Sequence, residues 1–366
     1  MKKELVPDEQ GIALAILFVL GNASIYGLGA RAGKDLWLAF LLAMALASPF
    51  ILMYARVRSM IYDKSLSEGL EHLYGKWASR FFGLGYAAYF WRLACYVSGG
   101  LASFSQSISL NNTPQSVIVL LPLIFAIWAA KLGVETLARF ASIFVRGVLF
   151  FLVVMFVLLL TTLDFTEFRP VLYDGFKPVF IGALELIDFP LTETVVLFGL
   201  FDVFASRKSP YKIYLPGALI AAFFLLSMSC ASLATIGAQK YMNNFYPIFV
   251  ATSRINLGGA ITRLEAVVGL IFILGAIFKV SVLILASAKA LAIGLRIKNY
   301  RHLVTPLALA VIAGSQWFVK SVMGIQLTAT KTIDSVDFTF QVLLPFVVWV
   351  IAEIKMFRLR KKGKFQ

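Results

Sequence analysis

Three carboxylates and a proline interrupt an apolar stretch in the middle of this chain. The run from Glu185 to Glu193 also contains Asp188 and Pro190, with apolar residues on both sides. Ionisable groups are costly in hydrocarbon, and those found there most often face a ligand, ion or proton site. Proline removes a backbone donor and clashes with the preceding turn, so we expect the helix to break here. Broken backbone at membrane depth is buried or lines a cavity, which makes this run the first candidate for a working site.

A second interruption lies near the N-terminus, where Gly21-Asn22-Ala23-Ser24 divides another apolar run. Glycine and an Asn–Ser pair weaken helix propensity and leave the backbone open. Half-helix N-termini at such a break attract an anion such as a carboxylate, and unwound carbonyls accept from an ammonium group. Close helix packing is the alternative, because glycine is common in membrane helices. Paired breaks in corresponding spans of two halves are typical of transporters built from inverted repeats.

Further charges deep in apolar segments need partners inside the protein. Lys279 follows Glu265 by about 14 residues, which places it roughly 21 Å along a helix that rises 1.5 Å per residue. We expect Lys279 to pair with a carboxylate or carbonyls, or to replace a coupling cation; a purely structural ion pair is the alternative. Arg92 is similarly deep and needs a partner. Asp188 and Glu193 lie deeper, and either one is expected to carry a proton or pair with a cation, whereas Glu185 is either part of the site or an interfacial carboxylate.

Composition indicates a polytopic membrane protein. Of 366 residues, 60% are hydrophobic and 14% are charged, against roughly 25% charged in soluble domains. The net charge of +15 is scattered over short loops and a tail, so nucleic-acid binding is not expected. His72 and His302 offer no metal cluster, and Cys95 and Cys230 lie in apolar stretches as packing residues. No nucleophile–base set or phosphate loop is evident, so we predict neither an enzyme nor a cofactor.

Hydropathy predicts ten membrane-spanning helices, because a span needs about 20 apolar residues. They are expected at 10–30, 36–55, 81–107, 114–131, 138–163, 180–205, 213–237, 260–289, 303–323 and 338–356. The termini and the even-numbered loops carry most of the Lys and Arg residues, and the opposite loops carry far fewer. Basic residues concentrate in cytoplasmic loops, so both termini are expected to be cytoplasmic.

The chain is expected to form a single membrane domain over residues 1–366. One repeat would cover about 10–163 and the other about 180–356, followed by a basic cytoplasmic tail at 357–366. Between the second and third spans, Ser65-Leu66-Ser67-Glu68 has the pattern of a capping box that opens a short helix. This helix is expected either to lie on the inner membrane face or to pack on the bundle as a connecting helix.

Several short motifs follow one another in a characteristic order. They are Ala32-Gly33-Lys34-Asp35-Leu36-Trp37, Leu73-Tyr74-Gly75-Lys76-Trp77, Thr113-Pro114, Gly133-Val134-Glu135-Thr136-Leu137-Ala138-Arg139, Gly182-Ala183-Leu184 before Phe189-Pro190, Arg263-Leu264-Glu265 and Phe278-Lys279-Val280-Ser281. With these motifs, residues 10–355 resemble the spore germination proteins of the germinant-receptor B-subunit family, which are similar to amino-acid permeases. One departure is Leu28-Gly29, where many members of that family carry Leu-Pro.

The resemblance implies a branch of the amino acid–polyamine–organocation transporter superfamily. Its fold would be an all-α integral membrane domain with ten helices in a five-plus-five inverted repeat, in which helices 1 and 6 are broken and hold the substrate. The protein would lie in the inner membrane of a bacterial endospore. It would assemble with an A and a C subunit and sense a small germinant, typically an amino acid.

We therefore predict an amino-acid site between the two breaks. The residues assigned to it are Gly21, Asn22, Ala23, Ser24, Ile25, Phe189, Pro190, Leu191, Thr192 and Glu193. The first break would offer backbone donors to the ligand carboxylate. The second would offer carbonyls and the Glu193 acid to its ammonium group, while Lys279 stabilises the broken region or substitutes for a coupling ion.

Two other function classes stay open. The first is a secondary transporter that moves amino acids by proton symport. The second is an ion-conducting subunit whose pore would be lined by small and polar residues of the third span, namely Gly99, Gly100, Ser103, Ser105 and Ser107. Helix packing explains these small residues equally well.

Overall fold

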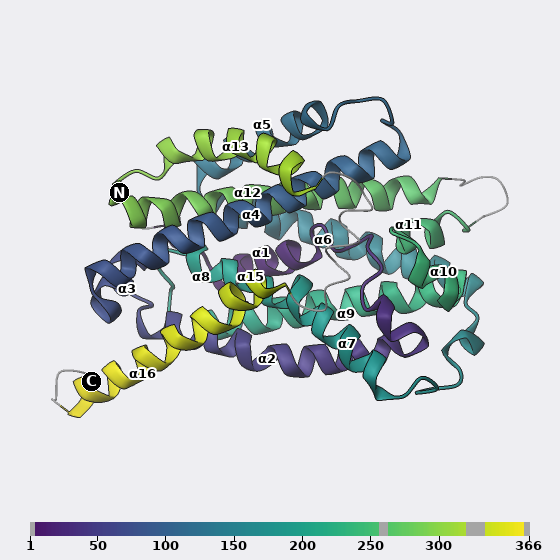
Figure 1. The fold of residues 1–366 in the computed structure, drawn as a ribbon, viewed down its shortest axis with the longest axis horizontal. Coiled ribbons are helices and arrows are strands. Elements are labelled where there is room, and N and C mark those ends of the chain that lie inside the picture. The colour runs from purple at the N-terminus through teal and green to yellow at the C-terminus, as the bar shows by residue number, and fades with distance from the viewer. Residues whose placement is uncertain (1–3, 256–262, 320–333, 362–366) are drawn as a thin grey trace.

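The long helices run side by side along one axis of the molecule (Figure 1). The computed structural model describes residues 4–255, 263–319 and 334–361. The long helices are α1 (Asp8–Leu20), α2 (Leu36–Met60), α4 (Lys76–Ile108), α5 (Gln115–Leu132), α6 (Val134–Leu159), α7 (Phe176–Leu186), α9 (Ser209–Ile236), α12 (Leu264–Leu295), α13 (Arg301–Phe318) and α16 (Leu344–Lys361). The shorter elements are η1 (Ala30–Asp35), α3 (Leu66–Tyr74), η2 (Leu160–Thr162), η3 (Phe165–Phe168), η4 (Ile187–Leu191), η5 (Thr192–Val195), α8 (Val196–Leu200), α10 (Ala238–Asn243), α11 (Pro247–Thr252), α15 (Ser335–Phe338) and η6 (Thr339–Leu343).

Each predicted span coincides with one of these helices or with a consecutive group of them. The first corresponds to α1 and the break after it, the sixth to α7 through α8, and the tenth to α15 through α16. The predicted span ends at 260–262 and 320–323, and residues 362–366 of the predicted tail, lie outside the described residues.

Six helical stretches of the described chain are long and apolar enough to cross a membrane. They are Ala30–Met60, Gln115–Leu132, Val134–Thr162, Ser209–Ile236, Leu264–Leu295 and Ser335–Arg358. The prediction of a multi-pass membrane protein is therefore confirmed, and the count of ten spans stays a prediction.

The position of each helix in the bundle follows from which of its faces are apolar. α1 and α12 are apolar on nearly every side and lie in the interior, where Phe18 and Phe272 are fully buried. α5 and α6 lie at the periphery and leave large apolar side chains uncovered, among them Leu121, Trp128 and Ile143. Such a surface suits lipid, because a soluble protein rarely exposes a large continuous apolar patch.

The short helix α3 begins with the expected capping box. The Glu68 N–H donates to Ser65 Oγ at 3.3 Å, and the Ser65 N–H donates to Glu68 Oε2 at 3.2 Å. Its apolar side chains Leu66, Leu70 and Leu73 are buried in a cluster that α16 completes. This face of α3 is therefore covered by protein, as the connecting-helix alternative expects.

The first helix break lies where the sequence predicts it. α1 ends at Leu20, and the chain is then non-helical until η1 begins at Ala30. The Gly21 N–H still donates to the Leu17 carbonyl at 2.8 Å, and the Ala23 N–H donates to the Leu20 carbonyl at 3.0 Å. The break therefore keeps part of its own backbone hydrogen bonding.

The second break also lies at the predicted run. α7 ends at Leu186, and Phe189 adopts an extended conformation (φ −136°, ψ 123°) immediately before Pro190. Proline cannot donate a backbone hydrogen bond and disfavours helical geometry in the residue that precedes it, which accounts for the interruption. The chain then returns to helix through η5 and α8.

A close approach between two glycines places the first break against α12. A Cβ atom on Gly275 would lie 2.6 Å from the Gly21 carbonyl oxygen and 3.0 Å from Gly21 Cα. Both neighbouring atoms belong to the backbone, so neither can move aside without shifting the break itself. The absence of a side chain at Gly275 therefore lets α12 support the unwound segment.

We expect Gly275→Ala to destabilise the protein by about 1–3 kcal/mol, the usual effect of overpacking a tight interior. The matched control is Gly147→Ala in α6, where an added Cβ would meet no atom within 4 Å. Thermal unfolding of the purified protein in detergent measures both. Equal unfolding midpoints for the two variants would contradict the structural role assigned to this contact.

Candidate functional site

A cavity of about 380 Å³ lies between the two breaks. Small-molecule sites commonly enclose about 300–1,000 Å³, so the space suits a compact ligand. Its wall includes both broken segments, α4, the chain after α10, and the region from α15 to η6. The lining residues are Asn22, Tyr26, Gly27, Leu28, Gly29, Ala30, Arg31, Arg92, Leu93, Tyr96, Val97, Gly100, Glu185, Leu186, Asp188, Phe189, Glu193, Met242, Asn244, Phe245, Asp334, Asp337 and Gln341.

The structure brings only some of the sequence-predicted residues to this wall. Asn22, Arg92, Asp188, Phe189 and Glu193 line the cavity. The remaining members of the two predicted runs do not line it, and they are Gly21, Ala23, Ser24, Ile25, Pro190, Leu191 and Thr192.

A buried ion pair between Lys279 and Glu193 lies at the inner end of the cavity. We call these two residues and Asn22 the base of the cavity. The Lys279 ammonium lies 2.5 Å from Glu193 Oε2 and donates to Asn22 Oδ1 at 2.8 Å. It also lies 4.9 Å from the ring centroid of Phe18 and 5.1 Å from that of Phe189. Lys279 thus has the carboxylate partner that its depth predicts, and one side chain of α12 contacts both breaks.

This pairing changes the expectation for Glu193. From the sequence, its carboxylate was expected to bind the ligand's ammonium group, whereas in the structure the same carboxylate pairs with Lys279. The side chain of Glu193 is only 6% exposed and that of Lys279 is fully buried. A buried carboxylate that already has a lysine partner has little remaining attraction for a second cation.

Arg92 finds its partners in the segment that opens the last helical group. Its guanidinium lies 2.5 Å from Asp334 Oδ2 and 2.7 Å from Asp337 Oδ1, and 4.9 Å from the ring centroid of Tyr96. Neither aspartate was predicted from the sequence. The available signal was their spacing of three residues immediately before an apolar span, which places them on one helix face.

A hydrogen-bonded group behind the second break was also missed. Gln341 donates to the Tyr89 hydroxyl at 2.8 Å, and its side-chain oxygen contacts the Thr192 hydroxyl. The Thr192 hydroxyl lies 2.6 Å from the Ile187 carbonyl, so this residue stabilises the broken helix. Gln341 was detectable as a lone amide within the last apolar stretch.

The exposure of the charged side chains shows where the cavity opens. Arg31 and Glu185 form an ion pair at 2.8 Å with side chains that are 34% and 20% exposed, in contrast to the buried pair at the base. We define these two residues as the mouth of the cavity. Glu185 therefore lines the cavity and also pairs with an arginine near the surface, so both of its alternatives stay open.

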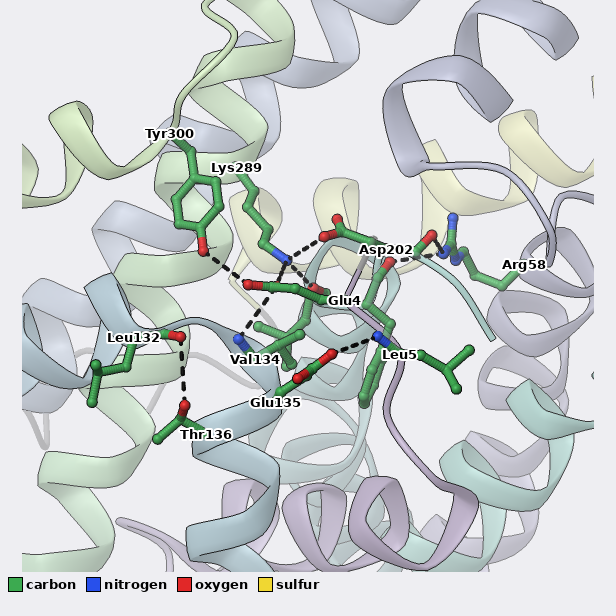
Figure 2. Close-up of polar contacts among 12 residues, drawn as sticks. Glu4, Leu5, Arg58, Leu132, Val134, Glu135, Thr136, Asp202, Lys289 and Tyr300 are labelled. Atoms are coloured by element: carbon green, nitrogen blue, oxygen red, sulfur yellow. Dashed lines mark hydrogen bonds and ion pairs between the residues drawn. The ribbon is translucent and has the colours of Figure 1, made fainter. Parts of the chain in front are cut away.

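The end of the bundle that contains the N-terminal segment is held by a second set of polar contacts, the Glu4 network (Figure 2). Lys289 donates to Glu4 at 3.1 Å, to Asp202 at 3.2 Å and to the Leu200 carbonyl at 3.0 Å. The Val134 N–H donates to Glu4 Oε2 at 3.4 Å. Tyr300, which immediately precedes α13, also donates to Glu4, so α6, α12 and the start of α13 meet around one carboxylate.

The small residues of α4 have structural neighbours. A Cβ on Gly99 would lie 2.6 Å from Val319 Cβ, and one on Gly100 would lie 2.7 Å from the Tyr26 hydroxyl oxygen. Ser105 and Ser107 donate to carbonyls one turn earlier in α4. These contacts favour the packing explanation over a pore lining.

A family model described as spore germination protein matches residues 5–320, most of the chain. The chain belongs to the spore germination protein family. Spore germination protein KB of Bacillus subtilis (strain 168) is 23% identical over 368 residues, covering 100% of this chain and 98% of that protein. Spore germination protein A2 of the same organism is 21% identical over 241 residues, covering 66% of each chain.

Solved structures with a similar fold include a symporter and a nucleobase-cation-symport-1 family transporter. The crystal structure of MhsT in complex with L-phenylalanine aligns with a TM-score of 0.61 at 13% identity, over 96% of this chain and 89% of that chain. A Na⁺-coupled sialic acid symporter aligns with a TM-score of 0.63 at 13% identity, over 92% and 79%. At this identity the likeness shows the fold alone. This spore germination protein therefore has the transporter fold with two broken helices that its resemblance implied.

We expect Lys279→Met to destabilise this spore germination protein by about 3–5 kcal/mol, because Glu193 would be left buried without its cation. The double variant Lys279→Met/Glu193→Gln should recover at least about half of the loss, since both charges are then removed. The control is Lys212→Met, whose pair with Asp8 spans 3.6 Å and whose side chain is 60% exposed.

An exposed pair of this kind contributes only about 0–1 kcal/mol. Thermal unfolding in detergent measures all three variants. A Lys279→Met variant that unfolds at the same temperature as Lys212→Met would refute a stabilising role for the buried pair.

Proposed function

We propose that this spore germination protein is the membrane subunit of a germinant receptor and binds a small germinant, an amino acid, in the cavity between its two broken helices. The observation that carries this proposal is the 380 Å³ cavity, whose wall combines residues of both breaks with charged groups from α4 and α15. Family membership supports the role in germination, and the transporter fold supports a small ligand at this place.

The chemistry of the wall suits a compact ligand with both polar and apolar parts. Tyr26, Tyr96, Phe189 and Phe245 supply aromatic surface. Asn22 supplies an amide at the base, where its side-chain oxygen is held by Lys279. Sites of this kind use apolar walls for affinity and a few fixed polar groups for orientation.

The two ends of the bundle differ in a way that favours sensing. The mouth is partly exposed, whereas the Glu4 network holds the opposite end together. The distribution of Lys and Arg supports a cytoplasmic position for that opposite end, so the cavity would open outward from the endospore inner membrane. A germinant would shift the equilibrium between open and occluded states by its different affinity for the two, and A and C subunits would respond to that shift.

A deletion of the gene should abolish spore germination in response to at least one compound of a panel of amino acids. Complementation with Phe189→Ala should raise the concentration for a half-maximal response by about tenfold or more, because truncating an aromatic side chain in a site typically costs more than 1 kcal/mol. The control is Phe150→Ala, whose side chain is 63% exposed on α6.

Germination is followed by the fall in optical density of the spore suspension, with immunoblots to confirm equal amounts of each variant. A deletion strain that responds normally to every compound would refute the receptor proposal.

The second candidate is a proton-coupled amino-acid transporter, favoured by the carboxylates at the second break and by the symporter fold. Proteoliposomes under an inward proton gradient test it with radiolabelled amino acids. We expect no uptake above protein-free liposomes, because Glu193 is held by Lys279. Gradient-dependent uptake that disappears in Glu193→Gln would favour the transporter instead.

A further inference from the structure

The charged groups of the cavity are not balanced. The described part of its wall contains five carboxylates and two guanidinium groups, and Lys279 adds one ammonium at the base. Four of the carboxylates have a basic partner. These ion pairs are Glu185 with Arg31, Glu193 with Lys279, and Asp334 and Asp337 with Arg92.

Asp188 differs from the other four. It forms no ion pair with any residue that the structure describes. The carboxylates of Asp337, Glu193 and Asp334 are close enough to repel its negative charge, and the Asp334 backbone N–H partly offsets that repulsion. Each of these three carboxylates is already paired with Arg92 or Lys279. The negative charge of the cavity is therefore concentrated around one unmatched carboxylate.

A carboxylate in such surroundings is stabilised either by a proton or by a positive group. Removing a charge from water is costly unless it is paired and hydrogen-bonded. Asp188 lines a cavity that is large enough for a ligand, so its partner can arrive with that ligand. The adjacent Phe189 ring adds attraction for a cation, and it already lies 5.1 Å from the ammonium of Lys279.

We propose that the ligand of this cavity carries a protonated amine and that Asp188 accepts it. This inference rests on the proposed function and defines the chemical class of the germinant. It also moves the ammonium-binding role from Glu193, which Lys279 occupies, to the carboxylate five positions earlier. An amino acid satisfies this requirement, and so does any small primary amine, whereas an uncharged sugar or a hydroxy acid does not.

Binding to the full-length protein in lipid nanodiscs tests the inference by isothermal titration. The probes are the amino acids, simple primary amines, and the 2-hydroxy acid of each amino acid that binds, in which a hydroxyl replaces the ammonium group. Uncharged sugars and nucleosides complete the set. The variants are Asp188→Asn, Asp188→Glu and, as a matched control, Asp174→Asn in an exposed loop.

We expect the amine-bearing probe to bind at least about 30-fold more tightly than its hydroxy acid, the usual effect of removing one partner of a buried charge pair. Asp188→Asn should weaken the amine by a similar factor and leave the hydroxy acid nearly unchanged, because the two changes remove the same interaction. Asp188→Glu should retain part of the binding, and Asp174→Asn should behave as wild type. Unliganded thermal unfolding confirms that each variant is folded.

The possible failures are distinguishable. Hydroxy acids or sugars that bind as tightly as amines, with affinity sensitive to Phe189→Ala, would overturn the amine requirement while the cavity remained the germinant site. An Asp188→Asn variant that binds amines normally would overturn the role of Asp188. If no probe binds and none depends on this gene for germination, the proposed function fails and this inference fails with it.

Discussion

The site depends on the contacts that the buried ammonium group of Lys279 makes with both helix breaks. This group is fully buried on the central helix α12 and bonds to Glu193 of one break and to Asn22 of the other. Unwound backbone inside a membrane protein is stable only where it is enclosed by protein or lines a cavity. The Lys279 ammonium lies between the two interruptions and helps to hold both segments in the protein interior. It neutralises the charge of the Glu193 carboxylate on one side and donates a hydrogen bond to the Asn22 amide oxygen on the other. The space between the breaks is then left for a ligand.

The remaining charges of the cavity are arranged around this fixed base. Arg92 holds two aspartates on the wall, and Arg31 holds Glu185 at the mouth. Each pair joins segments that are distant in the sequence, so the pairs define the walls as well as their electrostatics. At the opposite end, the Glu4 carboxylate accepts hydrogen bonds from Lys289 of α12, Val134 of α6 and Tyr300 at the start of α13. The Glu4 network thus holds one end of the bundle together, and the mouth at the other end is partly exposed.

Local features of the sequence explain where the helices break. Which side chains contact the broken segments depends on residues that are distant in the sequence. Gly21 and Pro190 disturb helix geometry by their own covalent structure, so both interruptions were predictable. The depth of Lys279 followed from the rise per residue of a helix and implied a carboxylate partner. Asp334 and Gln341 escaped prediction, because they reach the cavity from a segment more than 200 residues away from the helix that carries Arg92 and Tyr89. Which members of each predicted run face the cavity also depended on the local path of the unwound chain.

The sequence by itself determined the membrane class, the apolar segments and the two points where helices end, since these depend on hydropathy and on the conformational limits of single residues. Only the tertiary structure decided which charged side chains pair with one another. Lys279 is 86 positions from Glu193 and 257 from Asn22, and their contact depends on how the helices rotate and cross. Those angles are set by packing over the whole bundle, including the close approach of Gly275 to Gly21. For that reason the sequence could not indicate that Asp188, unlike the other cavity carboxylates, has no ion-pair partner among the described residues.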